Sequence, residues 1–162
     1  MNTNRFVLSA FLSWLLFLSL DFLAHASVLR SFWAQELAAL KPQRDLFRLI
    51  PAGYMSFLLL TLLVGWLYVS FHKDNGNAIR GMTFGAVFGG IYALALFLGW
   101  YSFLNLPILF LFLMGVVYFV EIVGVGFCFG YLMAAESLRK RVWPLIVVIF
   151  CIFVVGILLQ NL

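Results

Sequence analysis

Charged residues are scarce in this sequence. Only 10% of its 162 residues are charged, six acidic against ten basic, whereas 65% are hydrophobic. A soluble domain of ordinary composition has about 25% charged residues and could not hide so much apolar surface in a single core. The net charge of +4 does not indicate nucleic-acid binding, because the basic residues lie in short segments between apolar runs. The composition therefore predicts an integral membrane protein.

Cysteine and histidine are also rare, with two residues of each. Cys128 and Cys151 both fall inside apolar runs, where a thiol behaves as a small hydrophobic group, so no disulfide framework is predicted. No nucleophile with a neighbouring base and no phosphate-binding loop is visible, which favours a function other than catalysis. The sequence points to no particular cofactor.

Apolar runs long enough to cross a bilayer dominate what is present. About 20 residues of helix span a hydrocarbon core of about 30 Å. Five runs meet this length approximately, at residues 6–26, 51–71, 79–103, 107–135 and 144–160. We therefore predict an all-α transmembrane bundle of five spans that forms one domain over residues 1–162.

The connection between the first two runs has apolar residues at helical spacing. In residues 28–41 the apolar residues, among them Trp33, fall on one face of a helix and the polar and basic residues on the other. This pattern is typical of an amphipathic helix on the bilayer surface. Such a helix either joins two spans or covers the opening of the bundle as a lid. Residues 6–26 imitate a secretory signal peptide, but Asp21 just before the supposed cleavage point favours a true first span.

Basic residues are distributed unevenly between the two sides of such a bundle. One side holds the N-terminus and six basic residues: Arg5, Lys73, Arg80, Arg139, Lys140 and Arg141. The other side holds four: Arg30, Lys41, Arg44 and Arg48. Cytoplasmic loops carry the excess of basic residues. The count predicts a cytoplasmic N-terminus and a C-terminus outside.

Glycines recur at every fourth position in the third and fourth runs. Gly81, Gly85 and Gly89 form one series, and Gly126 and Gly130 form another. Small residues at this spacing let two helix backbones approach closely in a membrane. We expect these two runs to pack on each other.

Ionisable side chains within the spans are the first candidate site. Asp21 and His25 share a helix face, and Glu121 lies near the middle of its run with Tyr118 one turn before it. Three interpretations remain: a metal site, a proton or substrate relay, and a protonated Glu121 hydrogen-bonded between helices. A metal is disfavoured, because Asp21 and His25 are expected about 7 Å and 13 Å from the midplane and Glu121 near it.

Aromatic residues make up 19% of the chain. Trp33, Trp100 and Tyr101 are expected at the same interface. They would either belong to an aromatic belt or line a pocket for an apolar ligand.

Three segments resemble a family of uncharacterised bacterial four-helix inner-membrane proteins, known as a domain of unknown function. They begin at Asp21, at Leu29 and at Arg48, and the glycines at 85 and 89 and the Glu121–Gly124 pair fit the same pattern. The resemblance covers about residues 10–132. It implies a bacterial inner (cytoplasmic) membrane location and a helical architecture, but no activity. The fifth run is additional, and Leu96 and Phe97 replace a Tyr-Asp pair that the family often carries.

Two classes of function follow from these features. The first is binding or transport of a small apolar or amphipathic ligand, or a lipid, coupled to protonation of Glu121. The second is a structural or accessory subunit that docks on another membrane protein or on a second copy of this chain. A cavity beside the carboxyl groups would favour the first, and exposed glycine faces would favour the second.

Overall fold

The computed structural model describes residues 3–35, 41–72, 76–135 and 137–162. Within these ranges the chain is all-α, as predicted. The six helices are α1 (Thr3–Ala26), α2 (Arg30–Trp33), α3 (Gln43–Phe71), α4 (Ala78–Phe103), α5 (Ile108–Met133) and α6 (Leu138–Gln160). Five of the helices in the described ranges, all except the short α2, are long and apolar enough to cross a membrane.

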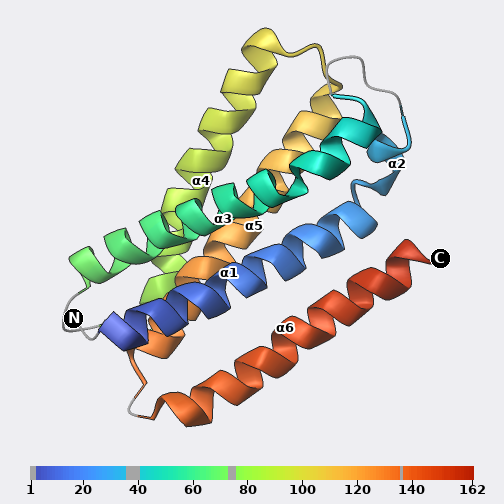
Figure 1. Ribbon diagram of the computed structural model, residues 1–162. Helices are drawn as coiled ribbons and strands as arrows, with labels where there is room; N and C mark the ends of the chain where they lie inside the picture. The colour runs from blue at the N-terminus through green and yellow to red at the C-terminus, as the bar shows by residue number, and fades with distance from the viewer. Residues whose placement is uncertain (1–2, 36–40, 73–75, 136) are drawn as a thin grey trace.

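Helix α1 occupies a central position in the bundle (Figure 1). It packs against α3, α5 and α6, while α4 packs almost entirely on α5. Figure 1 shows α6 lying along the side of α1 that is opposite α3. The contacts of α6 with α5 are few, so α6 is held to the bundle mainly by α1.

Two clusters of buried apolar side chains hold the helices together. The first joins α1, α3 and α5: Ala10, Phe17, Val64, Tyr68, Ile122, Val125 and Phe129. The second joins α1, α5 and α6: Leu12, Leu16, Cys128, Leu132, Leu145 and Ile149. Large apolar side chains also cover the outside of the long helices. In lipid such a surface is solvated by acyl chains, so this exterior supports a membrane location.

The glycines of α4 and α5 form the closest helix contact. A Cβ added to Gly81 would lie 2.1 Å from the Gly126 carbonyl oxygen, and one added to Gly130 would lie 2.3 Å from the Asn77 carbonyl oxygen. A Cβ on Gly85 would lie 2.8 Å from the Ile122 carbonyl oxygen. Only glycine permits backbones to approach this closely. The expected packing of these two spans is therefore present, and the glycine faces are used inside the bundle.

Two helices begin earlier than predicted. Helix α3 begins at Gln43 rather than at Pro51, and α6 begins at Leu138 rather than at Pro144, so both prolines lie inside helices. Proline is favoured in a first turn because it lacks an N–H, but it does not force a helix to start there. In both cases the preceding charged residues lower the hydropathy of the segment, although they continue the helix.

The predicted surface helix at residues 28–41 is much shorter in the described part of the chain. Helix α2 comprises Arg30–Trp33 only, and a turn follows it. Residues 36–40 of the prediction lie outside the described residues. The α2 segment closes back on α1, because the Leu29 N–H donates to the Ala24 carbonyl at 3.0 Å.

Candidate buried carboxyl site

Glu121 lies inside the bundle on α5. Its side chain is 1% exposed. Within the described residues neither carboxyl oxygen has a hydrogen-bond partner. The expected interhelical hydrogen bond is therefore not formed there. A buried polar group that lacks a partner costs about 1–3 kcal/mol, so this carboxyl group needs an explanation beyond packing.

Asp21 lies on the part of α1 that packs along α5. A Cβ added to Gly124 of α5 would lie 3.2 Å from Leu20 Cδ1 and 3.5 Å from Leu16 Cδ2 of α1. The turn of α1 that precedes Asp21 therefore contacts the turn of α5 that follows Glu121. The predicted depths of Asp21 and Glu121 relative to the membrane midplane stay a prediction.

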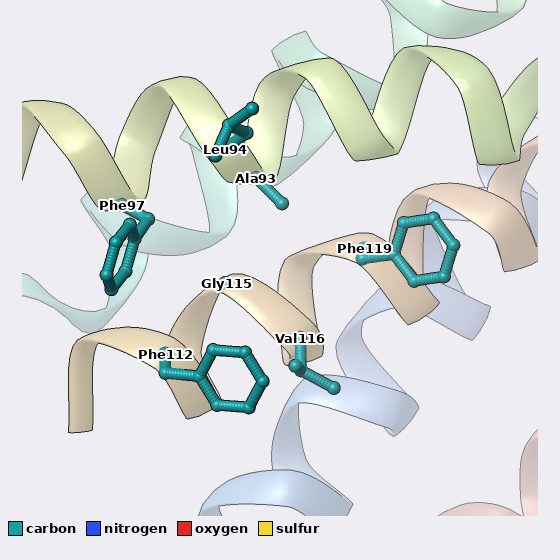
Figure 2. A pocket seen from close by; sticks show the side chains of 7 residues that line it. All are labelled: Ala93, Leu94, Phe97, Phe112, Gly115, Val116 and Phe119. Atoms are coloured by element: carbon teal, nitrogen blue, oxygen red, sulfur yellow. The ribbon is translucent and has the colours of Figure 1, made fainter. Parts of the chain in front are cut away.

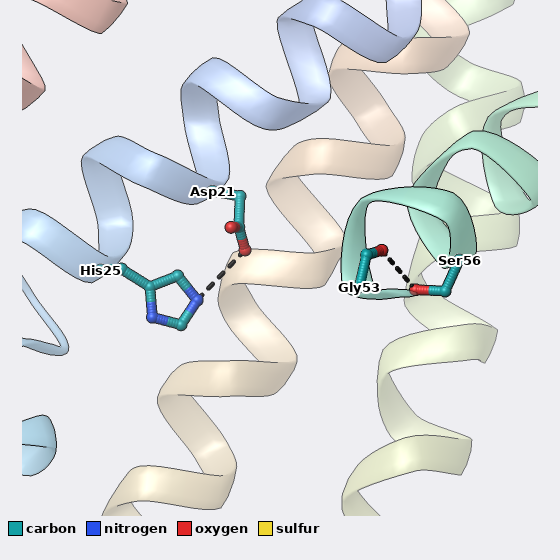
Figure 3. Close-up of polar contacts among 4 residues, drawn as sticks. All are labelled: Asp21, His25, Gly53 and Ser56. Atoms are coloured by element: carbon teal, nitrogen blue, oxygen red, sulfur yellow. Dashed lines mark hydrogen bonds and ion pairs between the residues drawn. The ribbon is translucent and has the colours of Figure 1, made fainter. Parts of the chain in front are cut away.

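His25 extends the site toward one end of the bundle. Its Nε2 lies 3.1 Å from Asp21 Oδ1, one helical turn earlier, as Figure 3 shows. The side chains of His25 and Asp21 are 30% and 17% exposed. Exposure thus falls from His25 through Asp21 to Glu121. Among the three predicted residues Glu121 is therefore the most buried.

A serine of α3 near this pair makes a hydrogen bond within its own helix. Ser56 Oγ donates to the Gly53 carbonyl at 2.7 Å (Figure 3). This hydroxyl is exposed and satisfied within its own helix, as serine often is in a membrane span. Ser56 therefore does not supply a partner to the Asp21–His25 pair.

Tyr118 gathers aromatic rings beside Glu121. Its ring makes edge contacts with Phe57 of α3 at 6.3 Å, with Tyr92 of α4 at 6.0 Å and with Trp100 of α4 at 6.3 Å between centroids. Tyr92 and Tyr118 both lie within electrostatic range of Glu121. Rings from three helices thus meet at Tyr118, one helical turn before Glu121 on α5. Phe57 and Tyr92 were not among the predicted site residues, because nothing in the spacing of one helix identifies its neighbours.

Trp33, Trp100 and Tyr101 have different neighbours in the described part of the chain. Trp33 lies 5.1 Å from the His25 ring and 5.6 Å from the Phe110 ring. Trp100 contacts Tyr118, whereas Tyr101 is 60% exposed and stacks on Phe97 at 6.1 Å. Rotation by about 100° per residue separates two consecutive side chains on a helix, so Trp100 and Tyr101 face different surroundings. Trp33 instead covers His25.

A separate apolar groove follows the seam between α4 and α5. It has a volume of about 340 Å³, with small residues at its floor and phenylalanines around it, as Figure 2 shows. The lining residues are Ala93, Leu94, Phe97, Phe112, Gly115, Val116 and Phe119. None of them is ionisable. The groove opens on the outer surface of two spans, and it is not the expected cavity edged by Asp21, His25 and Glu121.

No metal centre is apparent in the described ranges. No three His, Cys, Asp or Glu side chains gather there in a way that could hold an ion. Asp21 and His25 are paired on α1, and Glu121 lies on α5.

Two arginines that sequence reasoning did not select fix the end of α5. Arg5 of α1 donates to the carbonyls of Met133 at 3.0 Å and Ala135 at 2.8 Å. Arg141 of α6 donates to the Tyr131 carbonyl. These carbonyls belong to the last turn and the end of the helix, where the helix itself supplies no donors. Basic residues close to a predicted helix end were the available signal.

No family model, curated protein or solved structure matches this chain. Its class therefore rests on its own sequence and structure. Five long apolar helices with an apolar exterior define a polytopic integral membrane protein in contact with the lipid bilayer.

Proposed function

We propose that this protein binds a small amphipathic ligand within the membrane and couples its binding or transport to protonation of Glu121. The observation that carries the proposal is a carboxyl group that is 1% exposed in a membrane bundle and without a hydrogen-bond partner in the described residues. Intramembrane ionisable residues are costly, and in transporters they serve as proton-binding groups. A purely structural carboxyl group would be expected to have a partner.

The surroundings of Glu121 favour a lipophilic cation as the ligand. Aromatic rings attract cations over their faces, and Tyr118, one turn before Glu121 on α5, is in ring contact with Tyr92 and Trp100. Neutral Glu121 would lose its proton, and the cation would pair with the resulting carboxylate. One proton therefore leaves as one ligand binds. Asp21 and the more exposed His25 provide the path by which this proton is exchanged.

The alternative, a structural or accessory subunit, was based mainly on glycine faces that could dock on another protein. The glycine faces that were available for docking are occupied by the α4–α5 contact. Placement in a bacterial inner membrane, with the N-terminus in the cytoplasm, is part of the proposal. The six-to-four distribution of basic residues supports it.

Infrared titration tests the proton-binding role directly. The carboxylic C=O band of the full chain in lipid vesicles is compared between wild type and Glu121→Gln across a pH series. Gln keeps the shape of the side chain but cannot release a proton. We expect a protonated carboxyl band in wild type that Glu121→Gln removes. If the variant retained the same band, the protonated group would be another residue, and the proposal would be overturned.

Binding of a lipophilic cation tests the ligand class. Tetraphenylphosphonium is added to purified protein in weakly buffered detergent, and both bound probe and released protons are measured. We expect about one proton per bound probe in wild type and none in Glu121→Gln. The exposed carboxyl variant Asp45→Asn serves as the matched control and should behave as wild type. Probe binding without proton release in wild type would contradict the coupling.

A further inference from the structure

A second cavity lies at the charged end of the bundle. It has a volume of about 380 Å³ and is lined by Asn77, Ala78, Ile79, Tyr131, Ala134 and Arg141. These residues come from the beginning of α4, the end of α5 and the beginning of α6. Figure 1 shows that the N-terminal ends of α1, α4 and α6 gather at this end of the molecule, together with the C-terminal ends of α3 and α5. The cavity therefore opens at a membrane–water boundary.

Among the described residues, five basic ones lie at this end: Arg5, Arg80, Arg139, Lys140 and Arg141. Arg5 is committed to the carbonyls at the end of α5. Arg139 and Lys140 are exposed on α6 and do not line the cavity. Arg141 is the one basic side chain among the described residues that line the cavity. It therefore contributes a positive charge to the lining.

The guanidinium of Arg141 is held in a fixed position. Its Cζ lies 4.9 Å from the centroid of the Tyr131 ring, and one of its nitrogens donates to the Tyr131 carbonyl. That single bond uses one of the five N–H donors of an arginine. A guanidinium that is already oriented loses little entropy when it binds an anion, and its planar fork matches the oxygens of a phosphate.

The rest of the lining is apolar on the side that faces lipid. Ile79 is 71% exposed, and Ala78 and Ala134 lie beside it. An occupant would thus meet a cation on one side and hydrocarbon on the other. Basic pockets between transmembrane helices at the cytoplasmic surface bind anionic lipid headgroups. We propose that this cavity binds the phosphate-bearing headgroup of an anionic phospholipid, with Arg141 as its ligand and the acyl chains passing over Ile79.

Lipid retention by the full chain tests this site. The protein in a neutral detergent is incubated with phosphatidylglycerol or phosphatidylcholine of identical acyl chains, and retained lipid is counted by native mass spectrometry. We expect wild type to retain phosphatidylglycerol about fivefold more than phosphatidylcholine, as one basic contact at a membrane surface predicts. Inorganic phosphate in a third arm should not displace the lipid. Displacement by phosphate alone would overturn the lipid assignment.

Two variants separate a built site from general surface attraction. Ala134→Phe fills the cavity without changing charge, and Ala95→Phe on the exposed side of α4 is its control. Arg141→Gln removes the cation, and exposed Arg139→Gln is its control. We expect Ala134→Phe and Arg141→Gln to bring the retention ratio to about one, while both controls keep most of the preference. Melting in detergent identifies any variant that does not fold. If one of Ala134→Phe and Arg141→Gln fails to fold, the retention ratio of the other tests the proposal. Equal retention by wild type and the folded cavity variant would overturn the proposal.

Discussion

The guanidinium of Arg5 donates a hydrogen bond to the carbonyl of Ala135, 2.8 Å away and 130 positions later in the chain. A second bond from the same side chain reaches the Met133 carbonyl at 3.0 Å. One arginine at the beginning of α1 thus closes the end of α5. Hydrogen bonds from a charged donor contribute about 1.5–3 kcal/mol, so this contact adds to the apolar packing of α1 on α5.

Replacement of Arg5 should therefore loosen the bundle. Arg5→Met keeps much of the side-chain length but removes both donors, and we expect a loss of about 2 kcal/mol in unfolding free energy. Lys140→Met removes an exposed charge on the same side of the molecule and is the control. Thermal unfolding in detergent gives the measurement. Equal melting temperatures for the two variants would mean that the Arg5 bonds contribute nothing.

The effect of a glycine substitution in α4 on the free energy of unfolding should depend on its position. Gly85→Ala would place a Cβ 2.8 Å from a carbonyl oxygen of α5, whereas Gly99→Ala would meet no atom within 4 Å. We expect Gly85→Ala to cost about 1–3 kcal/mol through overpacking, and Gly85→Leu to cost at least as much. Gly99→Ala should be neutral or slightly stabilising, because alanine favours helix. Unfolding curves in one detergent compare them. A normal melting temperature for Gly85→Leu would show that α4 and α5 do not pack by this face.

Replacing buried polar side chains that have no hydrogen-bond partner with apolar ones should raise the free energy of unfolding. Thr61 is 0% exposed, and its hydroxyl has no partner in the described residues. Thr61→Val keeps the shape and removes the desolvation cost, so we expect about 1 kcal/mol of stabilisation. Glu121→Leu should stabilise as well, while abolishing the proton release proposed above. A strong destabilisation of Glu121→Leu would show that the carboxyl group holds the bundle together and would favour a structural role.

Topology can be checked with reporters at the C-terminus. The six-to-four charge distribution and five spans predict that Leu162 lies outside the cytoplasm. A reporter that is active only in the cytoplasm should be silent when fused after Leu162, and one that requires the periplasm should be active. The opposite pattern would mean that one of the five long helices does not cross the membrane.

The fold class and the pairing of α4 with α5 could be predicted from the sequence. Hydropathy defines the long helices, and the spacing of Gly81 and Gly85 marks a close approach. Asp45 was suitably placed for a helix start, and α3 begins two residues before it, at Gln43. The apolar run from Pro144 does not mark the start of α6 at Leu138, because the charged residues before it lower hydropathy without ending a helix. Local patterns report what a residue prefers, and preferences at helix ends are weak.

The site was predictable only in part. Glu121, Asp21 and His25 stand out because charge is rare in these spans. Their relative depth depends on how Leu16 and Leu20 seat against Gly124, which is a property of two helices together. For the same reason the rings around Tyr118 could not be identified, since Phe57 and Tyr92 approach it from other helices. Trp33, Trp100 and Tyr101 were grouped by depth alone, and depth does not fix direction around a helix axis.

The central position of α1 has a consequence for synthesis. Its main partners, α5 and α6, follow it by roughly 100 residues, which ribosomes translating at about 5–20 residues per second deliver only after about 5–20 s. During that interval Asp21 has no α5 to cover it. Helices α4 and α5, in contrast, are joined by a short turn and can pair as soon as both are made, since local contacts form fastest. The α4–α5 hairpin can therefore assemble before α6 is made, whereas α1 is the first helix made and among the last to reach its final contacts.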